Sequence, residues 1–435
     1  MSELKNGDVV QLNGGGYIKI INELGRGGQG IVYKVLMDDN EYALQWYFGR
    51  KLKNKTEFIN NLEKNIILGA PANNFLWPKK LTNEIDSSFG YVMDLRPKEY
   101  TDFSSILNNK ATFKNFHVMV ESAINIANSF RDLHRRGYSY QDLNDGNFFI
   151  NIDNGDVLIC DNDNVAPDGI NTGISGKPGY MAPEIVTGKK NPSIITDYHS
   201  LAVVLFKLLI RHDPLMGKAH ALRVCITEKV EQELYGTNPI FIFDPNNDSN
   251  APVRGIHKNP ILLWPKYPAY VHDIFIRAFC NGINNSNARP NDNEWRKTLI
   301  NLRGEILTCL NPDCQNDFLV STLKNNIVEC DRCKLKTSLP CYIEANKYRV
   351  YLYPGNSLYK CHTERDSDDC KTETGKVVKN KKDPTKWGIK NLSNDKWSIE
   401  TSNGKKIFNH GEVIPIIKDA KVTFNHVQTQ IILKN

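Results

Sequence analysis

The sequence lacks a hydrophobic run long enough to cross a membrane. Its longest apolar stretch, residues 201–210, is interrupted by Lys207, whereas a membrane-spanning helix needs about 20 apolar residues. The opening residues, MSELKNGDVV, also lack the basic segment followed by an apolar run that marks a secretory signal. We therefore expect a cytoplasmic protein that does not act at a membrane.

A strong excess of either charge is also missing. The 435 residues include 55 Lys and Arg and 49 Asp and Glu, a net charge of +6, which is too small to indicate a nucleic-acid partner. Residues 341–435 hold 17 basic and 11 acidic side chains, so the whole excess belongs to this segment. The 40% hydrophobic and 24% charged content excludes a disordered chain, and the length predicts about three domains.

Disulfides are not expected in a cytoplasmic chain, so the ten cysteines are predicted to be thiols or metal ligands. Four residues separate Cys309 from Cys314, fifteen follow, and two separate Cys330 from Cys333. Four thiolates suit tetrahedral Zn²⁺ and leave no open coordination position. The segment 304–340 resembles a zinc ribbon with a structural Zn²⁺, and Cys341 is an alternative ligand.

The secondary structure that the sequence pattern predicts changes along the chain. Residues 1 to about 100 are typical of short strands, and helical patterns dominate from about 102 to 303. The stretch 114–136 has amphipathic spacing, whereas 197–210 is apolar nearly all round and predicts a buried helix. Residues 341–435 predict a small β-rich domain, in which Trp387 and Trp397 frame two strands that we expect to pair through a turn.

A glycine-rich stretch is the first motif that carries chemistry. GRGGQGIV follows the β-like run IKIINEL, and glycines between strands let backbone N–H groups approach phosphates closely. An ordinary turn is the alternative interpretation of this stretch alone. Further motifs follow in a fixed order: YQDLNDGN at 140–147, DND at 161–163, GYMAPE at 179–184, TDYHSLAVVLF at 196–206 and ARP at 288–290.

Together these motifs resemble the eukaryotic-like protein kinase family over residues 15–303. The resemblance implies an α+β chain with a bilobal kinase domain over 1–303, in which the N-lobe covers about 15–97 and the C-lobe about 98–303. A zinc ribbon and a small all-β sandwich would follow at 304–340 and 341–435. The implied cofactors are ATP and Mg²⁺ or Mn²⁺.

The resemblance also assigns roles to residues. Asp142 matches the catalytic aspartate that orients the acceptor hydroxyl, and Asn147 and Asp161 match catalytic metal ligands. Glu184 and Arg289 match a structural ion pair, with Asp197 holding the catalytic loop from the buried helix. The positions that match the ATP-binding residues are Gly25, Gly27, Gly28, Gly30, Val32, Ala43, Gln45, Glu63, Met93, Asp94 and Leu95.

Several positions depart from the family pattern. Gln45 replaces the lysine that anchors the α and β phosphates, a loss worth on the order of a hundredfold in rate by analogy with a lost transition-state donor. Either the chain is a natural pseudokinase, or an engineered Lys→Gln change disabled an active kinase. For the helix glutamate that normally pairs with this lysine, Glu63 is the first candidate and Glu57 the second.

Other departures affect the catalytic loop and activation segment. Asn162 replaces the phenylalanine of the DFG motif, and Asn144 replaces a lysine common in Ser/Thr kinases. Gln141 leaves no arginine to receive an activation-loop phosphate, although Thr172 and Ser175 are candidate autophosphorylation sites.

The order of strands and turns in residues 341–435 resembles forkhead-associated domains, although the arginine and serine that grip phosphate there have no clear counterparts. The segments YALQWYF, FLWP and WGIKNLSND resemble bacterial kinases grouped with a tellurite-resistance-type von Willebrand A protein and a metal-dependent phosphatase. The implied partners are a protein substrate, such as a von Willebrand A-type protein, and an opposing phosphatase. The alternative function is a pseudokinase scaffold that recruits partners through the ribbon and β domain.

Overall fold

The computed structural model describes residues 3–28, 30–48, 52, 54–171, 173, 176–320 and 327–433. Thr172 and Ser175 lie outside these residues. The chain divides into two compact units. Unit 1 comprises Met1–Thr112, Asn125–Ile261 and Ile274–Asp292, and unit 2 comprises Phe113–Ile124, Leu262–Asp273 and Asn293–Asn435. Among the described residues, every helix is too short or too polar to span a membrane.

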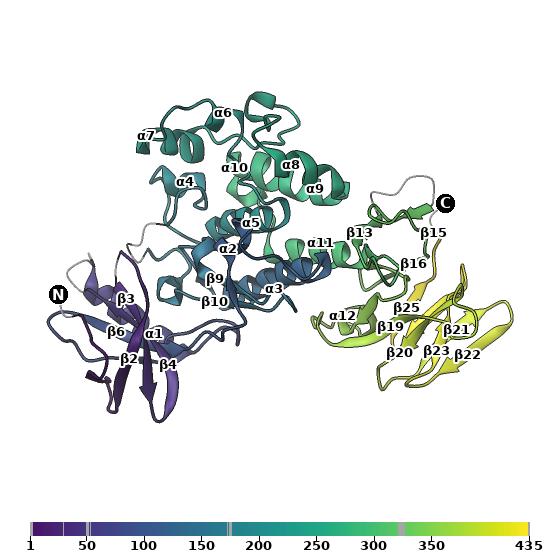
Figure 1. The fold of residues 1–435 in the computed structure, drawn as a ribbon, viewed down its shortest axis with the longest axis horizontal. Coiled ribbons are helices and arrows are strands. Elements are labelled where there is room, and N and C mark those ends of the chain that lie inside the picture. The colour runs from purple at the N-terminus through teal and green to yellow at the C-terminus, as the bar shows by residue number, and fades with distance from the viewer. Residues whose placement is uncertain are drawn as a thin grey trace. The chain divides into compact units, whose positions relative to one another are not determined.

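Unit 1 begins with an antiparallel sheet of six strands in the order β1-β2-β3-β4-β6-β5, with helix α1 (Lys55–Leu68) beside it (Figure 1). Its strands are β1 (Val9–Gln11), β2 (Tyr17–Arg26), β3 (Gly30–Met37), β4 (Asn40–Tyr47), β5 (Lys80–Leu81) and β6 (Phe89–Asp94). Strand β4 is buried on both faces: Leu44 and Trp46 join one apolar cluster, and Ala43 and Tyr47 join another with Phe58 of α1. Side chains alternate along a strand, so Gln45 shares the face of Ala43 and Tyr47.

The chain from residue 101 to 292 is mainly helical. Its helices are α2 (Phe103–Leu107), α3 (Phe116–Arg135), α4 (Pro183–Val186), α5 (Ile194–Ile210), α6 (Lys218–Ala221), α7 (Glu228–Gln232), α8 (Lys258–Leu263), α9 (Ala269–Ile276) and α10 (Gly282–Asn284). Short strands flank the catalytic motifs: β7 (Thr101–Asp102), β8 (Tyr138–Ser139), β9 (Phe148–Ile150), β10 (Val157–Ile159) and β11 (Ala166–Pro167).

Helix α5 confirms the predicted buried helix. A capping box begins it, because the Ser193 hydroxyl accepts from the Thr196 N–H and the Thr196 hydroxyl accepts from the Ser193 N–H. Nearly all of its later residues are buried. Such a helix gives the residues that it carries a fixed position.

Unit 2 contains most of helix α11 (Asp292–Gly304), three β-hairpins and two four-stranded sheets. The hairpins are β12 (Ile306–Thr308) with β13 (Asp317–Leu319), β14 (Ile327–Glu329) with β15 (Lys336–Ser338), and β16 (Tyr342–Ala345) with β17 (Tyr348–Tyr351). The sheets have the orders β18-β19-β20-β23 and β22-β21-β24-β25 and share one apolar core. Their elements are β18 (Ser357–Tyr359), α12 (Lys360–Thr363), β19 (Glu373–Lys379), β20 (Trp387–Asn391), β21 (Trp397–Thr401), β22 (Gly404–Phe408), β23 (Val413–Pro415), β24 (Lys421–Phe424) and β25 (Val427–Gln430).

The expected pairing of the Trp387 and Trp397 strands is wrong. Strand β20 pairs with β19 and β23, whereas β21 pairs with β22 and β24 in the other sheet. The connection between them is organised by the buried side chain of Asn391, which donates to the Asp395 carbonyl (2.8 Å) and accepts from the Ser393 N–H (2.9 Å). These bonds turn the chain from one sheet to the other instead of closing a hairpin.

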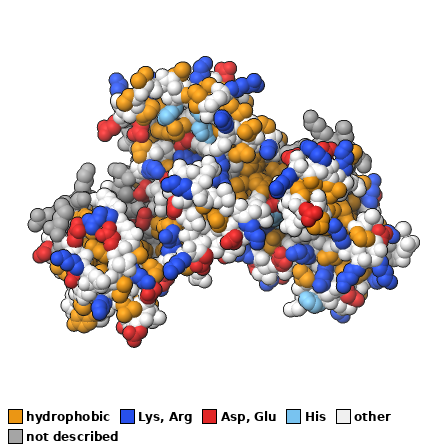
Figure 2. All heavy atoms as spheres, viewed as in Figure 1, with side chains coloured by type: hydrophobic (Ala, Val, Ile, Leu, Met, Phe, Trp, Pro, Cys, Tyr) orange, Lys and Arg blue, Asp and Glu red, His pale blue; other side chains and the backbone are white. Residues whose placement is uncertain are grey.

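Lys and Arg side chains are spread over the visible face of the C-terminal β region and are interspersed with Asp and Glu (Figure 2). On that face they do not form one continuous basic stripe. The basic side chains visible on this face are therefore dispersed and do not gather in one patch (Figure 2).

Candidate active site

The catalytic loop is held by Asp197 of α5, as the sequence predicted. One carboxylate oxygen accepts from the Tyr140 N–H at 2.6 Å, and the other accepts from the Gln141 N–H at 3.3 Å. The next residue is Asp142, and the Asn144 side-chain amide donates to its carboxylate at 3.1 Å. A buried helix thus fixes the backbone that presents Asp142.

A histidine between two acids supports Asp197. His134 of α3 lies 3.2 Å from the Asp197 carboxylate and 2.8 Å from that of Asp292, and all three are buried. Burial by itself lowers the pKa of His134, but the hydrogen bonds and charges of the two aspartates outweigh it and raise this pKa to about 9. His134 is therefore a cation at neutral pH, and it stabilises the charge of Asp197.

Asn147 and Asp161 come together at the predicted metal site. The Asn147 side-chain nitrogen donates to the Asp161 carboxylate at 3.3 Å, although strands β9 and β10 separate the two residues in the sequence. Burial, with the negative charges of Asp163 and Asp142, raises the pKa of Asp161 to about 7. The Asn147 Oδ1 atom is buried, and it has no hydrogen-bond partner among the described residues. Amide and carboxylate oxygens are the ligands that Mg²⁺ prefers, so this donor set fits a divalent cation.

Burial also raises the pKa of Asp142, against the hydrogen bonds from Asn144 and the Lys177 backbone and the charge of Lys177. A carboxylate with a raised pKa is a better proton acceptor near neutral pH. The arrangement can therefore take a proton from a hydroxyl beside the metal ligands.

The DND triplet is anchored by neutral groups. The fully buried Asn162 amide donates to the carbonyls of Leu76 and Ile159, each at 2.9 Å. Asp163 accepts a hydrogen bond from the Tyr47 hydroxyl. The sequence analysis missed both Asp163 and Tyr47. The available signals were the second carboxylate of the triplet and the position of Tyr47, two residues after Gln45 on the same face of β4.

The expected role of Glu63 is not supported, because its side chain is exposed on α1, and so is that of Glu57. The inward face of α1 instead carries Asn61 and Asn65, whose amides donate to the Val165 carbonyl at 2.8 and 2.9 Å. The fourteen-residue helix turns Asn61 and Asn65, and not its glutamates, toward the segment that follows the DND triplet.

The remaining ATP-binding candidates lie on neighbouring strands. Gln45, half-buried, is opposite Val32 of β3 and Tyr91 of β6, and Ala43 is opposite the buried Met93. After Met93 the strand ends at Asp94, whose carboxylate pairs with Lys79 at 2.6 Å, and Leu95 is half-buried. Their contacts with a nucleotide stay predictions.

The glycine-rich stretch joins β2 to β3. Gly25 is opposite Val32, and the Gly27 N–H donates to the Gly30 carbonyl at 2.9 Å. A Cβ at Gly30 would lie 2.0 Å from the Trp46 carbonyl oxygen, so only glycine fits there, whereas one at Gly25, Gly27 or Gly28 would meet open space. Gly30 is thus required by strand packing. At Gly25 and Gly27 no side chain stands between the backbone and an approaching phosphate.

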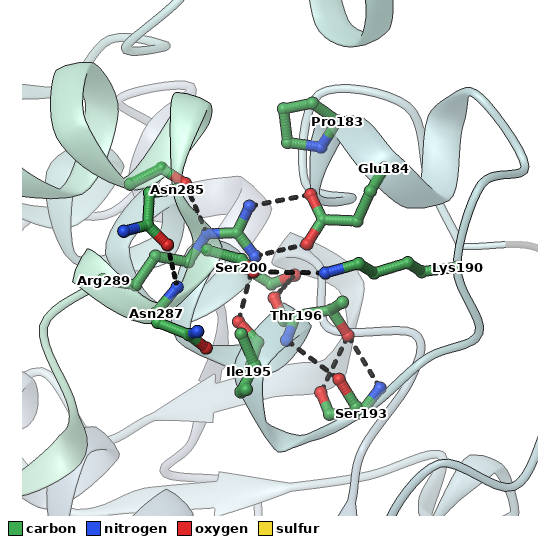
Figure 3. A network of polar contacts seen from close by, with 12 residues as sticks. Pro183, Glu184, Lys190, Ser193, Ile195, Thr196, Ser200, Asn285, Asn287 and Arg289 are labelled. Carbon is green, nitrogen blue, oxygen red and sulfur yellow. Dashed lines mark hydrogen bonds and ion pairs between the residues drawn. The ribbon is translucent and has the colours of Figure 1, made fainter.

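The predicted ion pair between Glu184 and Arg289 is confirmed. Figure 3 shows the guanidinium facing the carboxylate, and both nitrogen–oxygen distances are 2.7 Å. Burial raises the pKa of Glu184, but the hydrogen bonds and charge of Arg289 reverse this and lower it. A fork-shaped pair of this kind fixes orientation, and here it joins α4 to the segment before α11.

In unit 2, the four predicted zinc ligands form one cluster. The Sγ atoms of Cys309, Cys314, Cys330 and Cys333 all lie within 4.8 Å of one another. The pairs cross between the hairpins, with Cys309 3.4 Å from Cys333 and Cys314 3.7 Å from Cys330. Cys341 is not part of this group among the described residues. Four thiols at this spacing fit a tetrahedral thiolate metal site.

Comparisons with known proteins agree with the kinase motifs. The chain is 26% identical over 200 residues to protein kinase C delta type of Mus musculus, an alignment that covers 44% of this chain and 29% of that protein. The chain thus spans less than a third of the relative's length. A family model described as the protein kinase domain matches residues 18–254, more than half of the chain. The chain belongs to the protein kinase family.

Proposed function

We propose that this chain transfers the γ-phosphate of ATP to Ser or Thr residues of a partner protein. The observation that supports this most is the juxtaposition of Asn147 and Asp161, in which the buried Asn147 Oδ1 lacks a partner among the described residues. A buried oxygen without a hydrogen bond is costly, and a cation ligated there would relieve that cost.

Each residue at the site has a distinct task. Asp142 orients the acceptor hydroxyl and accepts its proton, and Asn144 and Asp197 keep its backbone and carboxylate in place. Asn147 and Asp161 would hold Mg²⁺ or Mn²⁺. A divalent cation, when bound, neutralises phosphate charge.

Gln45 limits the expected rate. A glutamine retains hydrogen-bonding capacity but carries no charge, so the α and β phosphates lose their usual ammonium. The specific alternative is a pseudokinase scaffold that binds nucleotide without transferring phosphate, and the same residue favours it. The intact Asp142, Asn147 and Asp161 favour slow catalysis over no catalysis.

Incorporation of radiolabel from γ-labelled ATP, into the chain itself and into co-purified von Willebrand A-type candidates, tests the proposal. We expect label on Ser or Thr that requires Mg²⁺ or Mn²⁺, disappears in Asp142→Asn and is removed by a metal-dependent protein phosphatase. Nucleotide binding with no label in either the original chain or a Gln45→Lys variant would favour the scaffold.

We also propose that the four-cysteine cluster is a zinc ribbon with a structural Zn²⁺. Four thiolates provide a closed coordination shell, and the metal would stabilise the two short hairpins that carry it. Metal analysis should find one Zn²⁺ per chain, and Cys330→Ser should lose it and lower the melting temperature. A full-length chain that is metal-free and equally stable would contradict this assignment.

A further inference from the structure

The site is rich in acids and poor in the cations that a triphosphate needs. The catalytic loop contains two of these acids, Asp142 and Asp145, and two more, Asp161 and Asp163, follow strand β10. The two positions at which the family pattern supplies lysines hold Gln45 and Asn144. Because ATP is strongly anionic, an unscreened cluster of carboxylates disfavours its γ-phosphate.

Lys177 brings a positive charge to this cluster from another segment. Its ammonium forms an ion pair with Asp145, and its backbone is hydrogen-bonded to Asp142. The charge of Lys177 lowers the pKa of Asp142, against the burial that raises it.

The backbone around Lys177 is held against the catalytic loop. A Cβ at Gly176 would lie 3.4 Å from the Gln141 carbonyl oxygen and 2.8 Å from the Met181 side chain. On the other side, the Tyr180 N–H donates to the Lys177 carbonyl at 3.1 Å, and Tyr180 is buried. The base of the side chain is therefore placed beside Asp142, and its ammonium pairs with Asp145 and lies 5.5 Å from the centre of the Tyr180 ring.

The ion pair with Asp145 is weak enough for the Lys177 ammonium to leave it. The Lys177 side chain is 52% exposed, and ion pairs with an exposed partner contribute little to stability. A lysine is a compact charge on a flexible stem, so it can exchange the Asp145 carboxylate for a phosphate near Asp142 at low cost.

We propose that Lys177 binds the γ-phosphate of the nucleotide and supplies the positive charge that Gln45 and Asn144 do not. This inference rests on the proposed kinase function and adds a residue to it. The β–γ phosphate bond breaks and the bond to the acceptor oxygen forms while Asp142 takes the hydroxyl proton. Lys177 stays protonated and stabilises the charge of the transferring group.

Binding of Mg·ATP and of Mg·ADP by calorimetry separates a γ-phosphate contact from a general effect. We expect Lys177→Met to weaken ATP binding about tenfold, as for a lost charge-assisted contact, and to leave ADP binding within about twofold. Lys177→Arg should keep most of the preference for ATP. The matched control, Lys189→Met, removes an exposed lysine of the same region and should change neither affinity.

The possible results test the role of Lys177 separately from the proposed kinase activity. Equal ATP affinity in the original chain and Lys177→Met, with unchanged transfer of label, would overturn the role of Lys177 and leave the kinase proposal standing. Parallel losses of ATP and ADP affinity would assign Lys177 a structural role and also overturn the inference. No binding of either nucleotide to the original chain would refute both proposals.

Discussion

The catalytic loop and strand β4 supply the two sides of the candidate site, and they are built on different interactions. The groups that support the loop include paired charges: His134 with Asp197 and Asp292, and Arg289 with Glu184. Around β4, the groups contributed by the strand are uncharged. Gln45 carries no charge, and Tyr47 donates to Asp163.

The residues predicted to bind the metal ion therefore keep their arrangement although the position predicted to anchor the phosphates carries no ammonium. The loop presents Asp142, Asn147 and Asp161, the predicted base and metal ligands, whereas β4 and α1 hold the DND segment in place with a phenol and amides. A nucleotide would then depend on a divalent cation, and on a lysine from another segment, for neutralisation.

The largest effect is expected when the predicted metal ligands are disabled. Asp161→Asn removes the carboxylate of the metal pair, and we expect phosphate transfer to fall by about a thousandfold or more, since metal neutralisation supplies several kcal/mol of transition-state stabilisation. Initial rates of label transfer measure this. The control Asp153→Asn alters an exposed loop, and a similar loss in both variants would show that the metal pair is not special.

Adding charge to the β4 side should have the opposite effect. Gln45→Lys restores an ammonium at the predicted phosphate anchor, and we expect transfer to rise by on the order of a hundredfold. Because Glu63 is exposed, the new lysine gains no helix glutamate and the rise should remain incomplete. Gln45→Met, of similar length and uncharged, should not increase the rate. An equal rise in both variants would attribute the effect to packing.

The paired charges of the loop side predict a pH dependence of stability. Because the pKa of His134 is raised to about 9 from an unfolded value near 6.5, its stabilisation is fully present below pH 6.5 and is lost as the pH rises through 9. We expect a loss of about 2–3 kcal/mol over this range. Urea unfolding from pH 6 to 9.5 measures it.

His134→Gln should remove that dependence and lower the stability at pH 6.5. The exposed His426 provides a matched variant, His426→Gln, which should keep the original pH profile. If His134→Gln still lost stability across pH 6.5–9 as steeply as the original chain, the loop side would not depend on a protonated His134.

The smallest effect is expected on the β4 side. Tyr47→Phe leaves the buried Asp163 without its phenol donor, which should lower the free energy of unfolding by about 1–2 kcal/mol. Tyr17→Phe, at an exposed tyrosine, should be neutral. Equal midpoints in denaturant for Tyr47→Phe and the original chain would show that this contact contributes nothing.

Motif order predicted much of the site from the sequence. Asp142, Asn147, Asp161, Asp197 and the partners of the Glu184–Arg289 pair lie in short motifs whose local structure is set by neighbouring residues. The burial of α5 followed from its nearly continuous apolar character. These features depend on local sequence, and they can therefore be predicted from one sequence alone.

Contacts between distant segments were harder to predict. Tyr47 and Asp163 are 116 residues apart, and no local pattern links them. The sequence did not show which face of α1 is buried, because both of its sides carry polar residues, so Asn65 and Glu63 could not be distinguished by hydrophobicity. Likewise, alternation at Trp387 and Trp397 indicates strands, but it does not say which strands pair.

The most direct test of the central claim is calorimetric titration of the full chain with ATP, with and without Mg²⁺, beside Asp161→Asn. The neutral β4 side predicts measurable binding to the original chain only when Mg²⁺ is present, and no Mg²⁺-dependent gain in the variant. Equal binding without Mg²⁺, or an undiminished Mg²⁺ effect in Asp161→Asn, would contradict a site that relies on its metal side.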